Sequence, residues 1–479
     1  MLPKSLIVIL LIVDLFLIES STVRINYVRC NYNGFTCSTS KHNTQLIYFQ
    51  CPNEDVTLFI NQFNSPSNIE SLQIQNCKNL TISFGCGSDL RNIESLIIKN
   101  IGFLKIQLQQ RTSHVPASVS FENIAYLEEI PKLAFAQHDK ITHSYNCITP
   151  KNDFRTLSFK NVTIGTVQSN AFHMPNKFGD FSFTDVKINR MQASAILVKL
   201  DKLSKFTIAN SEIDVVEHLA FQTTAKTVAF KQNKFIDIAS SGINGTIENF
   251  EFSINAVNTL QPYSISILCT NVHIFQNKFE YMKSGALEKI SPGLIEDSGM
   301  NFGKLKFVYE FKNNTIRFMD AGSINPDIAA YGNVATEIIV HGNRILCECE
   351  NIAWIFPGVG HGFNTRYLVP FYENLLNNKS NNLCSSSCDL PLASAIQQLQ
   401  NGKCLDNVTA DWICDNKNKI EPTTTIASLW STPHPSLTIS TRRSIPRPRG
   451  YILTIHGSSR MFKPINIILA IGLVFLGAI

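Results

Sequence analysis

The sequence predicts a repeat solenoid built from short parallel β-strands. Three observations predict this fold. Short segments of alternating apolar residues recur at a nearly constant spacing, an asparagine stands at the same place in many of them, and most cysteines lie before or after these segments. Of the 479 residues, 44% are hydrophobic and 16% are charged. This composition can fill a long core and excludes a disordered polyelectrolyte.

The repeats have a period of 22 to 25 residues. The tetrapeptide Ile-Glu-Ser-Leu begins at residue 69 and again at residue 93, an offset of 24. Further along, the pattern of Phe230, Asn233 and Phe235 recurs from Phe252 and from Ile274, in two steps of 22. Each repeat contains two apolar residues separated by one residue of any type, and this alternation predicts a short strand with one buried face.

The asparagine follows three positions after the second apolar residue, where the backbone leaves the strand and needs new hydrogen-bond partners. Several early repeats have another residue at this position, among them Val162, Val186 and Ser211. Stacking such turns pairs each strand with the next and builds one continuous core.

The N-terminal segment predicts export. Residues 1–20 contain Lys4, an apolar run and small residues at their end, which is the pattern of a signal peptide. Six Asn-x-Ser/Thr sequons agree with a secreted glycoprotein. They are Asn79, Asn161, Asn244, Asn313, Asn378 and Asn407.

The C-terminal segment predicts a membrane anchor. Residues 419–456 are rich in Ser, Thr and Pro and predict an extended stalk. Residues 457–479 combine three small residues, a short polar spacer and an apolar tail, which is the pattern of a GPI-attachment signal. We predict Gly457 as the attachment residue, and a short transmembrane tail remains the alternative. The expected location is the extracellular face of the plasma membrane.

Thirteen cysteines in an exported chain predict mainly disulfides. An odd number leaves at least one cysteine unpaired, and we expect a buried free thiol at Cys147 or Cys269, which lie between the two clusters. The disulfide candidates are Cys30, Cys37, Cys51, Cys77, Cys86, Cys347, Cys349, Cys384, Cys388, Cys404 and Cys414.

The repeat pattern resembles the leucine-rich repeat of extracellular proteins, with Phe, Ile and Val often in place of leucine. Residues 343–349, Asn-Arg-Ile-Leu-Cys-Glu-Cys, followed by Trp354, resemble the C-terminal cysteine cap of that family. The resemblance implies a horseshoe solenoid in which Cys384 and Cys404 match the two distal cysteines of the cap. A right-handed parallel β-helix is the alternative architecture, because its turns have a similar length and also stack asparagines.

The predicted domains follow from these features. A cysteine-containing cap occupies residues 21–64, the solenoid residues 65–345 and the C-terminal cap residues 346–418. The signal peptide precedes them, and the stalk and anchor follow.

The sequence predicts neither an enzyme nor a cofactor. It contains no zinc-protease, serine-hydrolase, phosphate-loop or dinucleotide-binding motif. Cys347 and Cys349 have a spacing that metal sites also use, but an exported chain favours disulfides there. Glu212, Asp214 and Glu217 form the densest acidic cluster, beside His218, and we interpret it as solvated surface.

The outward side chains of the predicted strands offer an extended binding surface. We predict a partner site at Lys231, Glu251, His273, Phe275 and Gln276, with Phe275 as an exposed aromatic anchor. The sequon Asn161 lies on the same predicted face, so a glycan there would direct binding toward the C-terminal repeats.

These features predict a cell-surface recognition or adhesion glycoprotein that binds a protein, either another chain or a second copy of itself. A carbohydrate-active β-helix enzyme and a structural matrix glycoprotein are the alternatives. The formal charge of +5 is too small over this length to indicate a nucleic-acid partner.

Overall fold

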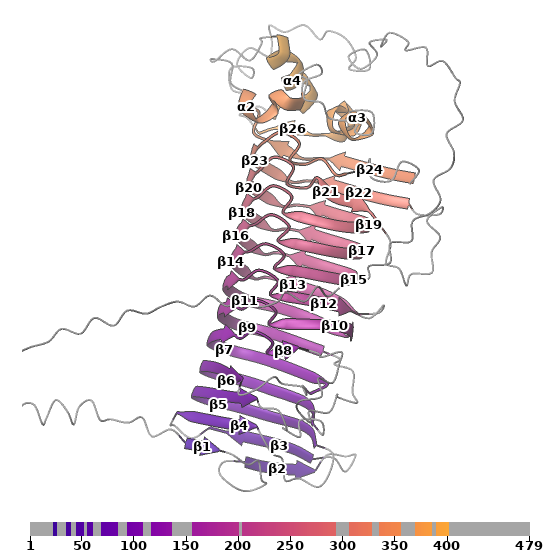
Figure 1. The fold of residues 1–479 in the computed structure, drawn as a ribbon. Helices are drawn as coiled ribbons and strands as arrows, with labels where there is room; N and C mark the ends of the chain where they lie inside the picture. Colours follow the sequence, from indigo (N-terminus) through magenta and orange to yellow (C-terminus); the bar gives the residue numbers. More distant parts are fainter. Residues whose placement is uncertain are drawn as a thin grey trace, which may run out of the picture. The chain divides into compact units, whose positions relative to one another are not determined.

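The computed structural model is a parallel β-solenoid whose strands stack in chain order (Figure 1). It describes residues 23–25, 35–39, 45–51, 55–60, 69–84, 93–108, 116–136, 156–200, 204–293, 306–327, 335–355, 369–385 and 389–401. Parallel pairing between successive turns builds three sheets, which we call the first, second and third sheet in the order in which the chain enters them within a turn.

The first sheet consists of β3 (Gln45–Gln50), the N-terminal parts of β5 (Ile69–Phe84), β6 (Ile93–Leu108), β7 (Ser118–Ile130), β9 (Thr156–Val167) and β11 (Asp180–Met191), then β13 (Lys205–Ala209), the C-terminal parts of β15 (Phe221–Lys231), β17 (Ile243–Ser253) and β19 (Ile265–Phe275), and finally β22 (Lys306–Lys312) and β24 (Ala335–His341).

The second sheet consists of β1 (Val23–Ile25), β4 (Val56–Ile60), the C-terminal parts of β5, β6, β7, β9 and β11, then β14 (Glu212–Val216), β16 (Lys234–Ile238), β18 (Ala256–Leu260), β20 (Lys278–Met282), β23 (Thr315–Met319), β25 (Arg344–Ile345) and β26 (Leu383–Cys384).

The third sheet consists of β8 (Phe135–Ala136), β10 (Phe172–Phe178), β12 (Ile196–Leu200), the N-terminal parts of β15, β17 and β19, and β21 (Lys289–Pro292).

The predicted parallel-strand solenoid is confirmed. The sequence offset between repeats equals the offset between paired strand residues, since Leu72 pairs with Leu96 and Phe252 pairs with Ile274. Three strand-bearing sides per turn fit the parallel β-helix that the sequence left open beside the horseshoe, because a leucine-rich-repeat arc carries a single sheet. The ladders begin at β1 and β3, inside the segment predicted as the N-terminal cap.

Alternating side chains fill the inside of the stack. Phe159 is fully buried and lies parallel to Phe121 on one side and to Phe183 on the other, with ring centroids 4.8 and 4.9 Å apart. This distance matches the spacing of neighbouring strands, so one aromatic residue per turn can form a continuous column. The alternation that predicted the strands therefore also determines the core.

A buried asparagine ladder runs through the turn between the first and second sheets. Asn277 Oδ1 accepts hydrogen bonds from the backbone N and the side-chain Nδ2 of Asn255, at 2.8 and 3.0 Å. Asn277 Nδ2 donates in turn to Phe252 O at 2.7 Å and to Asn314 Oδ1 at 3.0 Å. Each amide thus satisfies backbone groups that the strands leave unpaired, as the sequence predicted. The ladder comprises Asn233, Asn255, Asn277, Asn314, Asn343 and Asn382.

The residue before each ladder asparagine adopts a left-handed backbone conformation. Asn and Asp are favoured at such positions because their short side chains hydrogen-bond locally. The described positions of this first turn column are Asn76, Asn100, Asn123, Asn161, Asp185, Asn210, Gln232, Ile254, Gln276, Asn313, Gly342 and Asn381, with φ between 50 and 68°. The column therefore contains the unusual case of a β-branched residue, Ile254.

Both ends of the stack are covered. Strand β2 (Phe35–Thr39) pairs antiparallel with β3, and the disulfide Cys51–Cys77 links neighbouring turns there. The C-terminal end carries the short helices α2 (Cys349–Ile352), η5 (Ala353–Ile355), α3 (Val369–Leu376), η7 (Asn378–Ser380) and α4 (Leu392–Asn401). Covering terminal strands prevents edge-to-edge association.

The disulfide Cys347–Cys384 connects the chain after β25 to β26, and it links two of the cysteines that the family resemblance matched to the C-terminal cap. Cys37 is also disulfide-bonded. Cys349 lies in α2, whereas Cys30, Cys86, Cys147, Cys388, Cys404 and Cys414 lie outside the described residues.

Cys269 is the buried free thiol expected from the sequence. Burial raises its pKa to about 12, although backbone hydrogen bonds, the largest of them at Asn271, act in the opposite direction. In the neutral form, Sγ donates a hydrogen bond to Asn271 O at 3.1 Å. A thiol with so high a pKa is a poor nucleophile, so Cys269 serves as a small core residue.

Replacing a ladder asparagine should destabilise the fold far more than replacing an exposed one. In Asn277→Leu, the backbone N of Asn255 and the carbonyl of Phe252 lose buried partners, so we expect the free energy of unfolding to fall by about 2–4 kcal/mol. The control Asn258→Leu changes an exposed asparagine of β18 and should cost less than about 0.5 kcal/mol. Urea unfolding followed by circular dichroism measures both, and equal midpoints for the two variants would refute the role of the ladder.

Candidate functional site

The five residues predicted to bind a partner lie together on neighbouring turns. Three of them, Lys231, Glu251 and His273, point outward from the first-sheet parts of β15, β17 and β19. The residues that alternate with them along each strand are buried. Glu251 pairs in register with His273, and Ser253 pairs in register with Phe275. Phe275 is half-buried on the outer side of the sheet, and Gln276 is exposed in the turn that follows.

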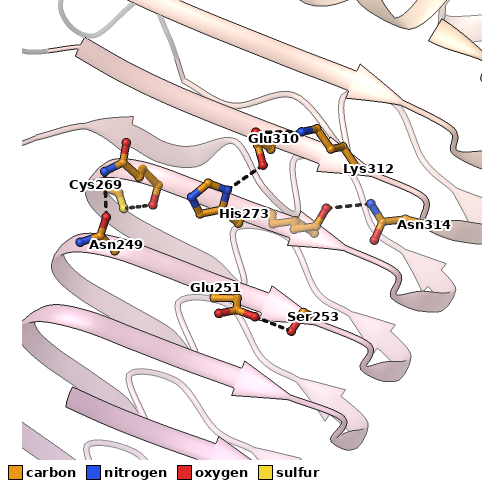
Figure 2. A network of polar contacts seen from close by, with 10 residues as sticks. Asn249, Glu251, Ser253, Cys269, His273, Glu310, Lys312 and Asn314 are labelled. Atoms are coloured by element: carbon orange, nitrogen blue, oxygen red, sulfur yellow. Dashed lines mark hydrogen bonds and ion pairs between the residues drawn. The ribbon is translucent and has the colours of Figure 1, made fainter.

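Charged side chains at this site pair with oppositely charged neighbours, and Figure 2 shows the contacts of Glu310 with His273 and Lys312. Glu251 contacts Lys231 at 2.7 Å and accepts a hydrogen bond from Ser253 at 2.9 Å. On the next turns, Glu310 contacts His273 and Lys312, each at 2.8 Å. The surface is therefore polar and nearly balanced in charge.

Glu310 has a lowered pKa. Partial burial by itself raises the pKa of this carboxyl, but the hydrogen bonds and charges of Lys312 and His273 outweigh that effect. The ionised carboxylate consequently stabilises the folded protein, and it holds two basic side chains on adjacent strands in fixed positions.

Ile254 supplies the exposed apolar group of this region. It occupies the first turn column at φ 57°, and 48% of its surface is exposed. Its backbone N donates to Phe275 O at 3.0 Å, which places it directly beside the predicted aromatic anchor. We call Ile254, Phe275 and Gln276, with the adjoining Lys231, Glu251 and His273, the corner patch.

The conformation of Ile254 is costly. A β-branched side chain in the left-handed region is a genuine outlier, and such strain costs about 1–3 kcal/mol. In the first turn column, Ile254 is the one apolar residue among the described positions. Strain retained at an exposed position favours a functional explanation over a packing one.

Sequence reasoning missed Ile254, although a signal was present. Aligning the repeats on their asparagines places Ile254 in the same position as Asn210, Gln232 and Gln276. An isoleucine among these polar residues could have marked the site without a structure.

The acidic cluster that the sequence singled out is divided among separate ion pairs. Glu212 contacts Lys234 at 2.8 Å and Lys187 at 3.8 Å, and Glu217 pairs with Arg190. The hydrogen bond from Lys234 lowers the pKa of Glu212, although partial burial opposes this. The proton donor of a glycosidase needs a raised pKa instead.

A groove of about 670 Å³ crosses the outer side of the third sheet. Its lining comes from β12, β15, β17, β19 and β21 and includes Gln222, Asn244 and Ser266, which are register neighbours. Among the lining residues that the structure describes, Asp327 carries the one carboxylate.

The sequons occupy different surroundings. Asn161 and Asn313 are exposed at turns, whereas Asn244 is half-buried in the groove. Asn79 donates to Asp55 at 2.7 Å. Asn378 begins η7, and Asn407 lies outside the described residues, as does Gly457.

Comparison with protein-family models, curated proteins and solved structures finds no match to this chain. The described residues contain no group of side chains arranged to hold a metal ion. Within the same part of the chain, no helix is both long and apolar enough to cross a bilayer.

The lowered pKa of Glu310 predicts a pH-dependent contribution to stability. This contribution is complete above the pKa of the unfolded chain, and it is lost as the pH falls from there through the lower pKa of the folded protein. Glu310→Gln should therefore be less stable than the unchanged protein at neutral pH, and the difference should shrink across this range. Glu373→Gln, on an exposed part of α3, should differ little at any pH. Urea unfolding at several pH values measures the difference, and one that does not vary with pH would contradict the assignment.

Proposed function

We propose that this chain is an exported cell-surface glycoprotein that recognises a protein partner through the corner patch. The observation that carries the proposal is Ile254, an exposed apolar side chain held in a costly backbone conformation beside Phe275. Apolar anchors surrounded by polar groups are typical of protein-binding sites. The charge-balanced surroundings favour a partner that is itself mixed in charge.

Several features support export. Disulfides at both ends of the solenoid are typical of an oxidising compartment. The signal-like N-terminus, the sequons and the cysteine cap that resembles extracellular leucine-rich-repeat proteins agree with this location. A GPI anchor attached at Gly457 would hold the protein at the membrane, and the Ser/Thr/Pro stalk would extend it outward.

Variants of the corner patch should separate binding from stability. Ile254→Asn removes the apolar anchor and relieves the backbone strain, so it should weaken binding at least about tenfold while raising the free energy of unfolding by about 1 kcal/mol. Leu219→Asn is the matched control, since Leu219 also has a left-handed conformation (φ 54°) but lies in the turn between the second and third sheets.

The measurement is the adhesion of cells that express the full chain to labelled cells that either express it or do not. Selective binding between expressing cells would indicate a second copy of this chain as the partner, and binding to other cells would indicate a separate receptor. Unchanged adhesion by Ile254→Asn would exclude the corner patch. No adhesion by the unchanged protein to any cell type would refute the recognition function.

A lipid anchor predicts release by a phosphatidylinositol-specific phospholipase. Treating intact cells should move most of the protein into the medium, and Gly457→Trp should prevent its display because the attachment site requires small residues. An epitope in the solenoid quantifies both fractions. Complete resistance of the unchanged protein to release would indicate a transmembrane tail instead.

A further inference from the structure

We propose that Asn244 carries an N-linked glycan whose first sugars lie in the groove of the third sheet. The inference rests on the proposed export, because only an exported chain meets the enzyme that attaches such glycans. It concerns a different surface from the corner patch and assigns the occupant of the groove.

The sequon stands at the centre of the groove. Asn244 and Thr246 both point outward from β17, the middle one of the five strands that line it. Two strands lie on either side, so the lining extends about 10 Å in each direction along the stack. Sugars attached at Asn244 therefore start inside the groove and not at its edge.

Gly245 brings the strands close together beneath the sequon. A Cβ at this position, where φ is 156°, would lie 1.9 Å from the backbone O of Thr223 in β15. Only glycine permits this approach. Gly245, the middle residue of the sequon, thus forms part of the floor of the groove. Asn244 and Thr246, the two residues that the glycosylating enzyme recognises, remain accessible.

The side-chain amide of Asn244 is available for modification. Within the described part of the chain, it has no hydrogen-bond partner, whereas Asn79 donates to Asp55 and Asn161 donates to Asn123. Attachment at Asn244 therefore breaks no hydrogen bond of the folded protein.

The lining suits an oligosaccharide, which has hydroxyl edges and apolar ring faces. Gln222 and Ser266 flank Asn244 with polar side chains, and Leu268 offers an apolar surface that is 38% exposed. Lys289 adds a hydrogen-bond donor beside Ser266. A mixture of apolar surface and a few polar groups is the usual composition of a ligand site, and the volume of the groove lies in the usual range.

The attachment is a group transfer from a lipid diphosphate-linked oligosaccharide. A C–N bond forms between the anomeric carbon and Asn244 Nδ2, and the C–O bond to the diphosphate breaks. The diphosphate leaves with the electron pair of that bond, and the amide nitrogen loses one proton. The resulting glycan occupies the groove and closes it to free oligosaccharides.

Enzymatic removal of the glycans tests the inference. A peptide N-glycosidase is applied to the protein from an exporting eukaryotic cell, both folded and denatured, and mass spectrometry detects the aspartate that release leaves at each site. In the folded protein, release at Asn244 should be at least about tenfold slower than in the denatured protein, because the groove contacts must open first. Asn161 and Asn313, exposed at turns, should show a much smaller difference.

A variant distinguishes groove contacts from general shielding. Leu268→Ser removes the apolar surface and should accelerate release at Asn244 in the folded protein severalfold. The matched control is Ile236→Ser, since Ile236 is 39% exposed on the second sheet and should have no effect.

Each outcome bears on the inference. Slow release at Asn244 that Leu268→Ser relieves supports it. If Asn161 or Asn313 carries a glycan while Asn244 does not, or if Asn244 is released at the same rate folded and denatured, the inference fails and export stands. If all three sites lack glycans, the inference fails together with the proposed glycoprotein.

Discussion

The fold depends on the hydrogen bonds that each turn makes to the next. Strands supply these bonds along the three sheets, but the chain must bend between sheets, where the backbone cannot pair regularly. At the turn between the first and second sheets, the buried asparagine ladder forms hydrogen bonds with the backbone groups that the strands leave unpaired. Because each amide contacts the turns before and after its own, the ladder holds the turns in one register, and that register determines which side chains lie outside.

The corner patch and the groove are both consequences of this register. Ile254 precedes a ladder asparagine and therefore must adopt the left-handed conformation, whichever side chain it carries. Asn244 and Thr246 point outward because buried residues of β17 alternate with them. One surface thus presents an exposed apolar side chain and the other a glycosylation sequon, and both belong to the same turn of the solenoid.

Much of the fold could be predicted from the sequence because the turns repeat. The asparagine positions and the strand pairing at 22 to 25 residues follow from spacing and polarity, and the odd number of cysteines predicted a buried free thiol at Cys147 or Cys269. The number of sheets could not be predicted, since a bend such as that in β15, between Ala225 and Thr227, leaves no mark in the apolar pattern. The five outward residues were recognised by alternation, whereas Ile254 and the groove depend on turn conformation and on the approach of strands, which alternation does not encode.

The equal offset between β15, β17 and β19 has a consequence for the length of the molecule. Each of these turns contains 22 residues and presents the same ladder contacts to both neighbours. One complete turn can therefore be duplicated or deleted while the remaining interfaces keep their partners. The distance between the two caps can change only in increments of one strand spacing, about 4.8 Å. In this part of the solenoid, inserting or deleting a block of 22 codons would therefore change its length by one strand spacing and leave the register intact.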